Sequence, residues 1–136
     1  MLPLLIPLLI YCAAEASRYS HTHEDDLHFS NSEEGPRIDR HSFFKQSYRL
    51  GYKLSLFCEA HGRPRPDMRW YKNGVELLPK PGLRIRNSVA GDTLSSHLDI
   101  DPAGVMDAGE YECVANNSYG YHLEHMRAQY RLKEAR

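Results

Sequence analysis

The chain of 136 residues has room for one domain of ordinary size and a tail, and hardly enough for two. It is 41% hydrophobic and 26% charged, as is ordinary for a globular protein, and its formal net charge is -1. A near-neutral chain is a poor candidate for nucleic-acid binding, because domains with that role usually carry a strong basic excess.

The first sixteen residues, MLPLLIPLLIYCAAEA, have the pattern of a signal peptide. A short apolar run ends in small residues, and Ala14 and Ala16 have the spacing that a signal peptidase needs, with cleavage after either alanine. The run is too short to span a membrane, which takes about 20 apolar residues, and it contains two prolines. We expect residues 1–16 to be removed from a secreted, soluble protein that does not insert into membranes.

The three cysteines, Cys12, Cys58 and Cys113, agree with this expectation. Cys12 lies in the segment that we expect to be removed, and an oxidising compartment favours pairing of the other two. If they pair, they close a loop of about 55 residues, which stabilises the fold by about 4 kcal/mol on a chain-entropy estimate.

Residues 17–36 are polar and show no apolar periodicity. Arg18 is their single basic residue, and five acidic residues accompany it: Glu24, Asp25, Asp26, Glu33 and Glu34. This composition predicts a disordered acidic leader. The histidines of this segment, His21, His23 and His28, lie among the carboxylates but lack a rigid ligand set, so we expect no metal site.

From residue 37 onward, the chain consists of short segments in which apolar and polar positions alternate. Alternation of this kind predicts β-strands, here separated by Gly, Pro and Asn. Four segments each place one group of residues on a single face: Leu54, Leu56, Cys58 and Ala60; Met68 and Trp70; Leu94, Ser96, Leu98 and Ile100; Tyr111, Cys113 and Ala115. Asn73-Gly74 predicts a two-residue hairpin turn. The pattern indicates an all-β sandwich.

The last segment, YHLEHMRAQYRL, alternates in two competing phases. Leu123 belongs to one phase, and the other contains Met126, Ala128, Tyr130 and Leu132. A β-bulge can switch a strand between phases, so the sequence does not decide which residues form the inner face of this strand. His122 and His125 are three residues apart and point to opposite faces, so we do not expect them to share a metal. Residues 133–136 form a short tail.

Two cysteines and one tryptophan have the spacing of a known structural unit. In one kind of two-sheet sandwich, a tryptophan packs against the disulfide between the sheets, and a tyrosine two residues before the second cysteine fixes a corner. The chain holds these residues in the expected order: Cys58, Trp70, Tyr111 and Cys113. With GRPRPDMRWYKNGVEL at 62–77 and LDIDPAGVMDAGEYECVANNSYG at 98–120, the chain resembles the immunoglobulin superfamily, and within it the I-set type.

The resemblance covers residues 37–132 and implies an immunoglobulin-like two-sheet Greek-key sandwich with one inter-sheet disulfide, Cys58–Cys113. It implies that Trp70 packs on this disulfide and that the Tyr111 hydroxyl bonds to backbone a few residues upstream. Gly51 stands where I-set domains often place a glycine at the entry to a strand.

The acidic stretch before Cys113 has two interpretations. It can suggest acid/base or thiol chemistry, but catalysis by cysteine requires a partly exposed thiolate, and Cys113 is expected to be oxidised and buried. The resemblance instead implies structural roles for Gly109 and for Asp107, which should pair with a basic residue, with Arg84 ahead of Arg86. We therefore expect neither an enzyme nor a cofactor.

A group of basic residues is a candidate glycan site. The cluster contains Arg63, Arg65, Arg69 and Lys72. Guanidinium groups bind sulfate through charge and paired hydrogen bonds, so the cluster can take a heparan-type sulfated glycan. The alternative is an ordinary solvated surface around a rigid proline-containing loop.

Other residues are candidates for modification or contact. The sequon at 116–118 makes Asn116 a candidate for N-glycosylation. Tyr119 and Tyr121 offer rigid amphipathic area for an interface. Phe43 and Phe44 are adjacent, so we expect one of them to pack in the core.

These features predict a secreted single-domain protein that binds a cell-surface or extracellular-matrix protein, such as a receptor or another immunoglobulin-superfamily member. Resemblance to the nematode one-immunoglobulin-domain group and to neural adhesion molecules implies work at neuronal surfaces, in synaptic organisation, receptor clustering or adhesion. The alternatives are a soluble growth-factor or receptor antagonist assisted by heparan sulfate, and a structural matrix component. Homodimerisation through sheet faces or edges is compatible with the family.

Overall fold

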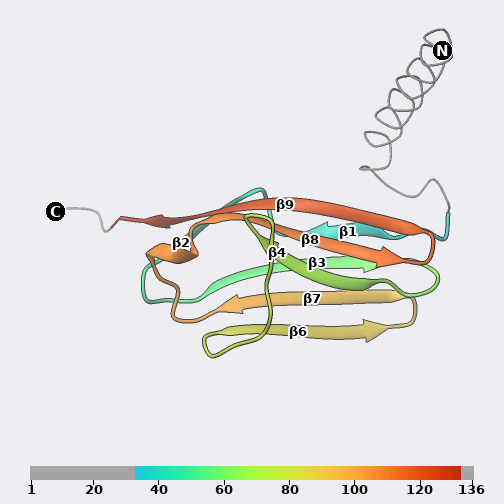
Figure 1. Cartoon of the computed structure of the whole chain (residues 1–136), viewed down its shortest axis with the longest axis horizontal. Helices are drawn as coiled ribbons and strands as arrows, with labels where there is room; N and C mark the ends of the chain where they lie inside the picture. Colours follow the sequence, from blue (N-terminus) through green and yellow to red (C-terminus); the bar gives the residue numbers. More distant parts are fainter. Residues whose placement is uncertain (1–32, 133–136) are drawn as a thin grey trace, which may run out of the picture.

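The computed structural model describes residues 33–132 as two β-sheets packed face to face (Figure 1). The expected signal peptide, most of the acidic leader and the C-terminal tail lie outside the described residues. The elements are β1 (Arg37–His41), β2 (Lys45–Arg49), β3 (Leu54–His61), β4 (Asp67–Lys72), β5 (Val75–Glu76), β6 (Leu83–Ala90), β7 (Thr93–Ile100), the 3-10 turn η2 (Val105–Asp107), β8 (Gly109–Asn117) and β9 (Gly120–Arg131).

The first sheet has the strand order β1-β3-β7-β6, and the second has the order β2-β9-β8-β4-β5. Paired strands are antiparallel except β2 and β9, which run parallel. This arrangement confirms the all-β immunoglobulin-like sandwich. Every inner-face residue expected from the four alternating segments is buried, so the period-2 pattern alone located most of the core.

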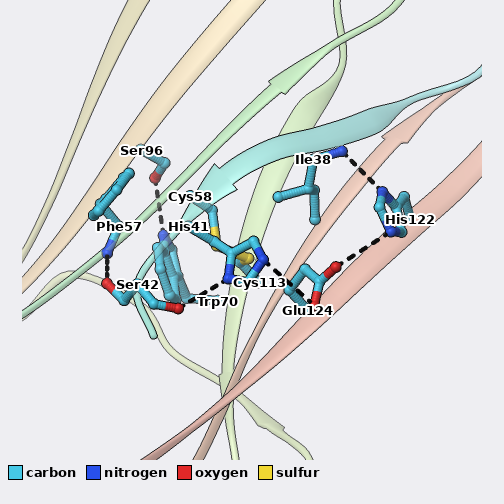
Figure 2. Close-up of a disulfide and its surroundings, with 10 residues drawn as sticks. All are labelled: Ile38, His41, Ser42, Phe57, Cys58, Trp70, Ser96, Cys113, His122 and Glu124. Carbon is cyan, nitrogen blue, oxygen red and sulfur yellow. Dashed lines mark hydrogen bonds and ion pairs between the residues drawn. A yellow bond between two sulfur atoms is a disulfide. The ribbon is translucent and has the colours of Figure 1, made fainter. Parts of the chain in front are cut away.

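Two links join the sheets at the centre of the core (Figure 2). The first is the expected disulfide between Cys58 and Cys113, with Cα atoms 6.5 Å apart. Trp70 lies beside the sulfurs and is fully enclosed. Its indole Nε1–H donates a hydrogen bond to the buried Ser96 Oγ at 2.9 Å, and this bond is the second link between the sheets.

The loop between β7 and β8 is fixed by hydrogen bonds to its backbone. The buried Tyr111 hydroxyl donates to the Asp107 carbonyl at 2.6 Å, in the geometry of a tyrosine corner. Tyr48 from β2 and Gly51 from the following turn also donate to carbonyls of this loop, at 2.8 Å each. Burial raises the pKa of Tyr111 well above its usual value, and the Asp107 charge raises it further.

Asp107 does not form the expected ion pair with Arg84. Its carboxylate accepts the Gly104 N–H at 2.7 Å. Gly104 precedes Asp107 by three residues, and the short 3-10 turn between them places this N–H next to the carboxylate. Arg84 is exposed on β6, and the ion pair of that strand joins Arg86 to Asp99 at 2.9 Å. The aspartate therefore closes its own loop instead of tying the loop to β6.

Asn73-Gly74 forms the predicted two-residue turn, with Lys72 and Val75 paired across it and φ of 48° and 80° at its two residues. Close to this turn, Gly109 begins β8 with a φ of 153°. A Cβ at Gly109 would lie 3.1 Å from the Asn73 side chain, so a larger residue would push that side chain aside.

β9 keeps one phase throughout. Its pairing with β8 runs without a register shift, so Met126 and Ala128 face the core and Tyr130 packs against it, while Leu123 lies on the outer side. The β-bulge that the sequence allowed does not occur between these two strands. Leu132 lies beyond the strand and is exposed.

The expectation that Phe43 or Phe44 packs in the core is wrong: they are 85% and 50% exposed. Both lie in the connection where the chain crosses from β1 in the first sheet to β2 in the second, so strand alternation does not turn either ring inward. Ser42 is the buried residue there, and its hydroxyl and N–H both bond to the Phe57 backbone.

Replacing both Cys58 and Cys113 by alanine should lower the free energy of unfolding by about 4 kcal/mol, because the bond closes a 55-residue loop of the unfolded chain. Urea unfolding followed by Trp70 fluorescence measures this loss. The wild type under reducing conditions is the matched comparison and should lose a similar amount. A double variant as stable as the oxidised wild type would contradict a structural disulfide.

Tyr111→Phe should cost about 1–3 kcal/mol of unfolding free energy, because the Asp107 carbonyl loses its buried donor. The control is Tyr52→Phe, which removes a hydroxyl from an exposed ring and should change stability by less than about 0.5 kcal/mol. Equal effects of the two substitutions in thermal unfolding would rule out the corner as a stabilising contact.

Candidate interaction face

The outer side of the second sheet presents side chains from three adjacent strands, which lie together in Figure 1. We call this surface the β4–β8–β9 face, and it consists of Arg69, Tyr71, Glu112, Val114, Asn116, Tyr121, Leu123 and His125. Their position follows from the alternation that buries Trp70 and Cys113, because neighbouring residues point to opposite sides of a strand.

The centre of the β4–β8–β9 face is apolar. Val114 pairs directly with Leu123 of β9, and both side chains are half-buried by their neighbours. Tyr71 and Tyr121, also half-buried, lie in the rows on either side. Leu123, whose phase conflicted with the rest of its strand in the sequence, is thus explained as an outward residue in a row with Val114.

Two arginines and one histidine surround this apolar centre, each close to a carboxylate. Arg69 lies 3.8 Å from Glu76 of β5, His125 lies 3.2 Å from Glu112, and the Arg127 guanidinium lies 2.6 Å from Glu110. Exposed pairs of this kind add little stability, typically 0–1 kcal/mol. An apolar centre inside a polar rim is the anatomy of a protein–protein interface.

The outer side of the first sheet has a different character. Ser55 donates to Asp99 at 2.7 Å, Arg86 donates to the same carboxylate at 2.9 Å, and Ser95 donates to Glu59 at 2.7 Å. Burial acts to raise the pKa of Asp99, but the hydrogen bonds from Ser55 and Arg86 and nearby positive charges hold it below its usual value. Polar groups on this side are thus largely engaged with one another.

The two tyrosines proposed for an interface lie in different places. Tyr121 is on the β4–β8–β9 face, opposite Asn116. Tyr119 is half-exposed in the turn between β8 and β9, and its N–H donates to Asn117 Oδ1 at 2.8 Å. A hydrogen bond with Glu34 raises the pKa of the Tyr119 hydroxyl. Tyr121 therefore belongs to the face, and Tyr119 to its adjoining loop.

The two neighbouring asparagines of the sequon have different environments. Asn117 Nδ2 donates to the carbonyls of Glu34 at 2.8 Å and Pro64 at 3.0 Å, so this amide holds the start of the domain to a loop. Asn116 points outward and forms no side-chain hydrogen bond with the described residues. The acceptor residue of the sequon is thus the one whose amide is available for a glycan.

The four basic residues proposed for a glycan site do not form one patch. Arg63 is paired with Asp92 at 2.8 Å, and Arg65 donates to the Gly91 carbonyl at 3.1 Å, near the turn between β6 and β7. Arg69 belongs to the ion-paired rim. Lys72, at the far end of β4, packs over the Tyr111 ring and donates to the Met106 carbonyl. Proximity in sequence did not predict proximity in the fold here.

Figure 2 shows a polar cluster between β1 and β9 that the sequence did not reveal. His122 Nδ1 accepts the Ile38 N–H at 2.8 Å, and its Nε2 lies 3.5 Å from Glu124 Oε1. The other Glu124 oxygen lies 3.8 Å from His41 Nε2. His122 thus holds the backbone of β1 against β9, a role that only the pairing of distant strands reveals.

Burial lowers the pKa of His122. The positive charges of Arg37 and His41 act in the same direction, and the carboxylates of Glu124 and Asp39 oppose it. A neutral ring agrees with the geometry, because Nδ1 must carry a lone pair to accept the Ile38 N–H.

Among residues 33–132, no group of three or more His, Cys, Asp and Glu side chains is arranged to hold a metal ion. The leader histidines lie outside the described residues. Within the same range, the chain has no helix with the length and apolar character that crossing a membrane requires.

The chain matches the family model of the immunoglobulin I-set domain over residues 36–128. It is 50% identical over 110 residues to the immunoglobulin domain-containing protein oig-1 of Caenorhabditis elegans, which covers 80% of this chain and 80% of that protein. It is 46% identical over 90 residues to oig-4 of the same organism, covering 65% of this chain and 58% of that protein.

Among solved structures, the fold is similar to the Dpr2 Ig1-Ig2 complex with DIP-Theta Ig1-Ig3, with a TM-score of 0.68 and 23% identity, covering 71% of this chain and 32% of that chain.

The stability of the domain should fall as the pH drops below about 6.5, the ordinary histidine value. The unfolded chain then takes up a proton at His122, whereas the folded state, with its lowered pKa, resists that proton until the pH is lower still. His122→Gln, which keeps an acceptor for Ile38 but does not titrate, should lose less stability between pH 7.5 and 5.5 in thermal unfolding.

The matched control is Gln129→Ala on the outer side of the same strand, which changes an exposed side chain that does not titrate, leaves the bond to Ile38 intact and should keep the wild-type dependence. If His122→Gln and the wild type had the same pH profile, His122 would not be the group responsible.

Proposed function

The chain belongs to the immunoglobulin I-set family, and from this premise we propose that it is a secreted, non-catalytic binding protein for a cell-surface or extracellular-matrix protein. The disulfide supports an oxidising, extracellular location, since such bonds persist there and are rare in the cytosol. The apolar run at residues 1–16 supports export.

The observation that carries the proposal is the Val114–Leu123 pair at the centre of the β4–β8–β9 face. Burying two such side chains against a partner removes apolar area from water, which stabilises the complex by about 25 cal/mol per Å² of buried apolar area. The ion pairs at the rim can exchange partners at low cost, because exposed pairs contribute little to the free domain.

The partner that fits this surface best is itself a sheet, as in another immunoglobulin-superfamily domain or a receptor ectodomain. Three adjacent strands with short side chains at the centre form a broad face rather than a pocket for a small molecule. A second copy of this chain is one case of such a partner. We propose that Asn116 carries an N-glycan at the margin of the face, beside Tyr121.

The proposed setting is the neuronal surface, in synaptic organisation, receptor clustering or adhesion. This part of the proposal rests on the resemblance to the nematode one-immunoglobulin-domain proteins. Expression restricted to neurons or muscle supports it over the alternative of a soluble antagonist of a growth factor or receptor.

The test measures binding of the tagged, secreted full chain to cells of its source tissue by flow cytometry. Val114→Lys/Leu123→Lys should weaken binding about 30-fold, because two central contacts each contribute about 1 kcal/mol or more to a typical interface. Trypsin treatment of the cells should remove the signal if the partner is a protein.

The control variant is Leu78→Lys/Val89→Lys, which adds the same charge at exposed apolar residues away from the face and should bind like the wild type. Equal losses in both variants, or a signal that survives trypsin, would refute this face as a protein-binding site.

A further inference from the structure

A second cluster of cations lies where β2 runs parallel to β9. The register places Lys45 opposite Arg127 and Arg49 opposite Arg131. All four side chains are exposed, and because they share one phase of their strands they lie on the same side of the sheet. We call them the β2–β9 basic cluster. It joins segments about 80 residues apart, at the opposite end of β9 from the apolar pair.

The cluster is poorly neutralised within the domain. Cations directly opposite one another across two strands repel and destabilise the sheet. Of these four cations, Arg127 alone has a carboxylate partner among the described residues, Glu110 at 2.6 Å. Arg49 lies over the Tyr52 ring at 4.6 Å. By contrast, Arg63 of the first basic group already has Asp92 as its partner. Within residues 33–132, three of the four cations thus have no carboxylate partner along β2 and β9.

A groove of about 460 Å³ runs beside this cluster. Its lining includes Lys45, Arg127 and Arg131 together with Gln46, Gln129 and the half-exposed Phe44 ring. The groove thus combines cations and side-chain amides with one aromatic surface. Along a strand that rises about 3.3 Å per residue, Arg127 and Arg131 stand about 13 Å apart, so the charges form a row rather than a single point.

We propose that this groove binds a sulfated glycosaminoglycan chain. A row of cations matches a linear polyanion with repeated charges, and guanidinium groups form paired, charge-assisted hydrogen bonds with the oxygens of an oxyanion such as sulfate. Gln46 and Gln129 can bond to sugar hydroxyls, and Phe44 can pack against an apolar sugar face.

A glycosaminoglycan suits the site better than other polyanions. A disulfide-bonded domain belongs to an oxidising compartment, where nucleic acid is not the usual partner. A membrane surface is broad and cannot enter a groove lined by the side chains of two paired strands, whereas a single polysaccharide chain can. Apart from Arg127, whose pair with Glu110 lies at the rim of the β4–β8–β9 face, the residues of the groove lie outside that face, and glycan binding here does not require the proposed protein partner.

The test uses the full secreted chain on immobilised heparin at about 0.15 M salt, where the charges of separate exposed groups are partly screened. The wild type should be retained, and Lys45→Ala/Arg131→Ala should bind about 30-fold more weakly in a surface-binding titration, since each cation near an anionic surface contributes a factor of about 5. Its melting temperature should not fall, because the substitutions relieve repulsion.

Arg63→Ala/Arg65→Ala is the matched control: it removes the same charge at the other basic site and should retain heparin binding. Gln129→Glu, which adds a carboxylate to the groove, should also lose binding. Failure of the wild type to bind heparin, equal losses in the control, or undiminished binding to desulfated heparin would each overturn the proposal. So would binding to vesicles of anionic phospholipid with the same dependence on Lys45 and Arg131.

Discussion

The register of both sheets is set at the centre of the core, where four residues form two links side by side. Cys58 pairs with Ser96 in the first sheet, and Trp70 pairs with Cys113 in the second. The disulfide joins one member of each pair, and the indole–hydroxyl bond joins the other two. A slip of one residue in either sheet would turn its members outward and break both links at once. Because the two links fix the register of each sheet, they also determine which side chains lie on the outer faces.

β9 carries two surfaces of different chemistry in its two halves. Tyr121, Leu123 and His125 belong to the apolar face and its rim, while Arg127 and Arg131 belong to the basic cluster. All of them follow from the single phase that buries Met126 and Ala128. A protein partner at one end of this strand and a polysaccharide at the other can therefore be held by one domain at the same time, with the strand as their common support.

The sequence predicted the features that depend on local pattern. The buried residues of the alternating segments, the Asn73-Gly74 turn and the Cys58–Cys113 bridge all have signals within a strand, a turn or a family motif. Features that depend on neighbours in space were missed. The Asp107 carboxylate accepts a hydrogen bond from a backbone N–H of its own turn instead of pairing with Arg84. The rings of Phe43 and Phe44 are exposed because the chain changes sheets there. The grouping of cations on β2 and β9 requires a parallel pairing that no local pattern reveals.

The parallel pairing of β2 and β9 also determines how the domain responds to tension. The chain enters the ladder at Lys45 and leaves it at Arg131, at opposite ends of two strands that run in the same direction. A force that separates the two ends along the strand axis therefore slides one strand past the other, and the bonds of the ladder share the load instead of opening one after another. Tension on the chain segments that flank this ladder would therefore meet its hydrogen bonds in the resistant direction.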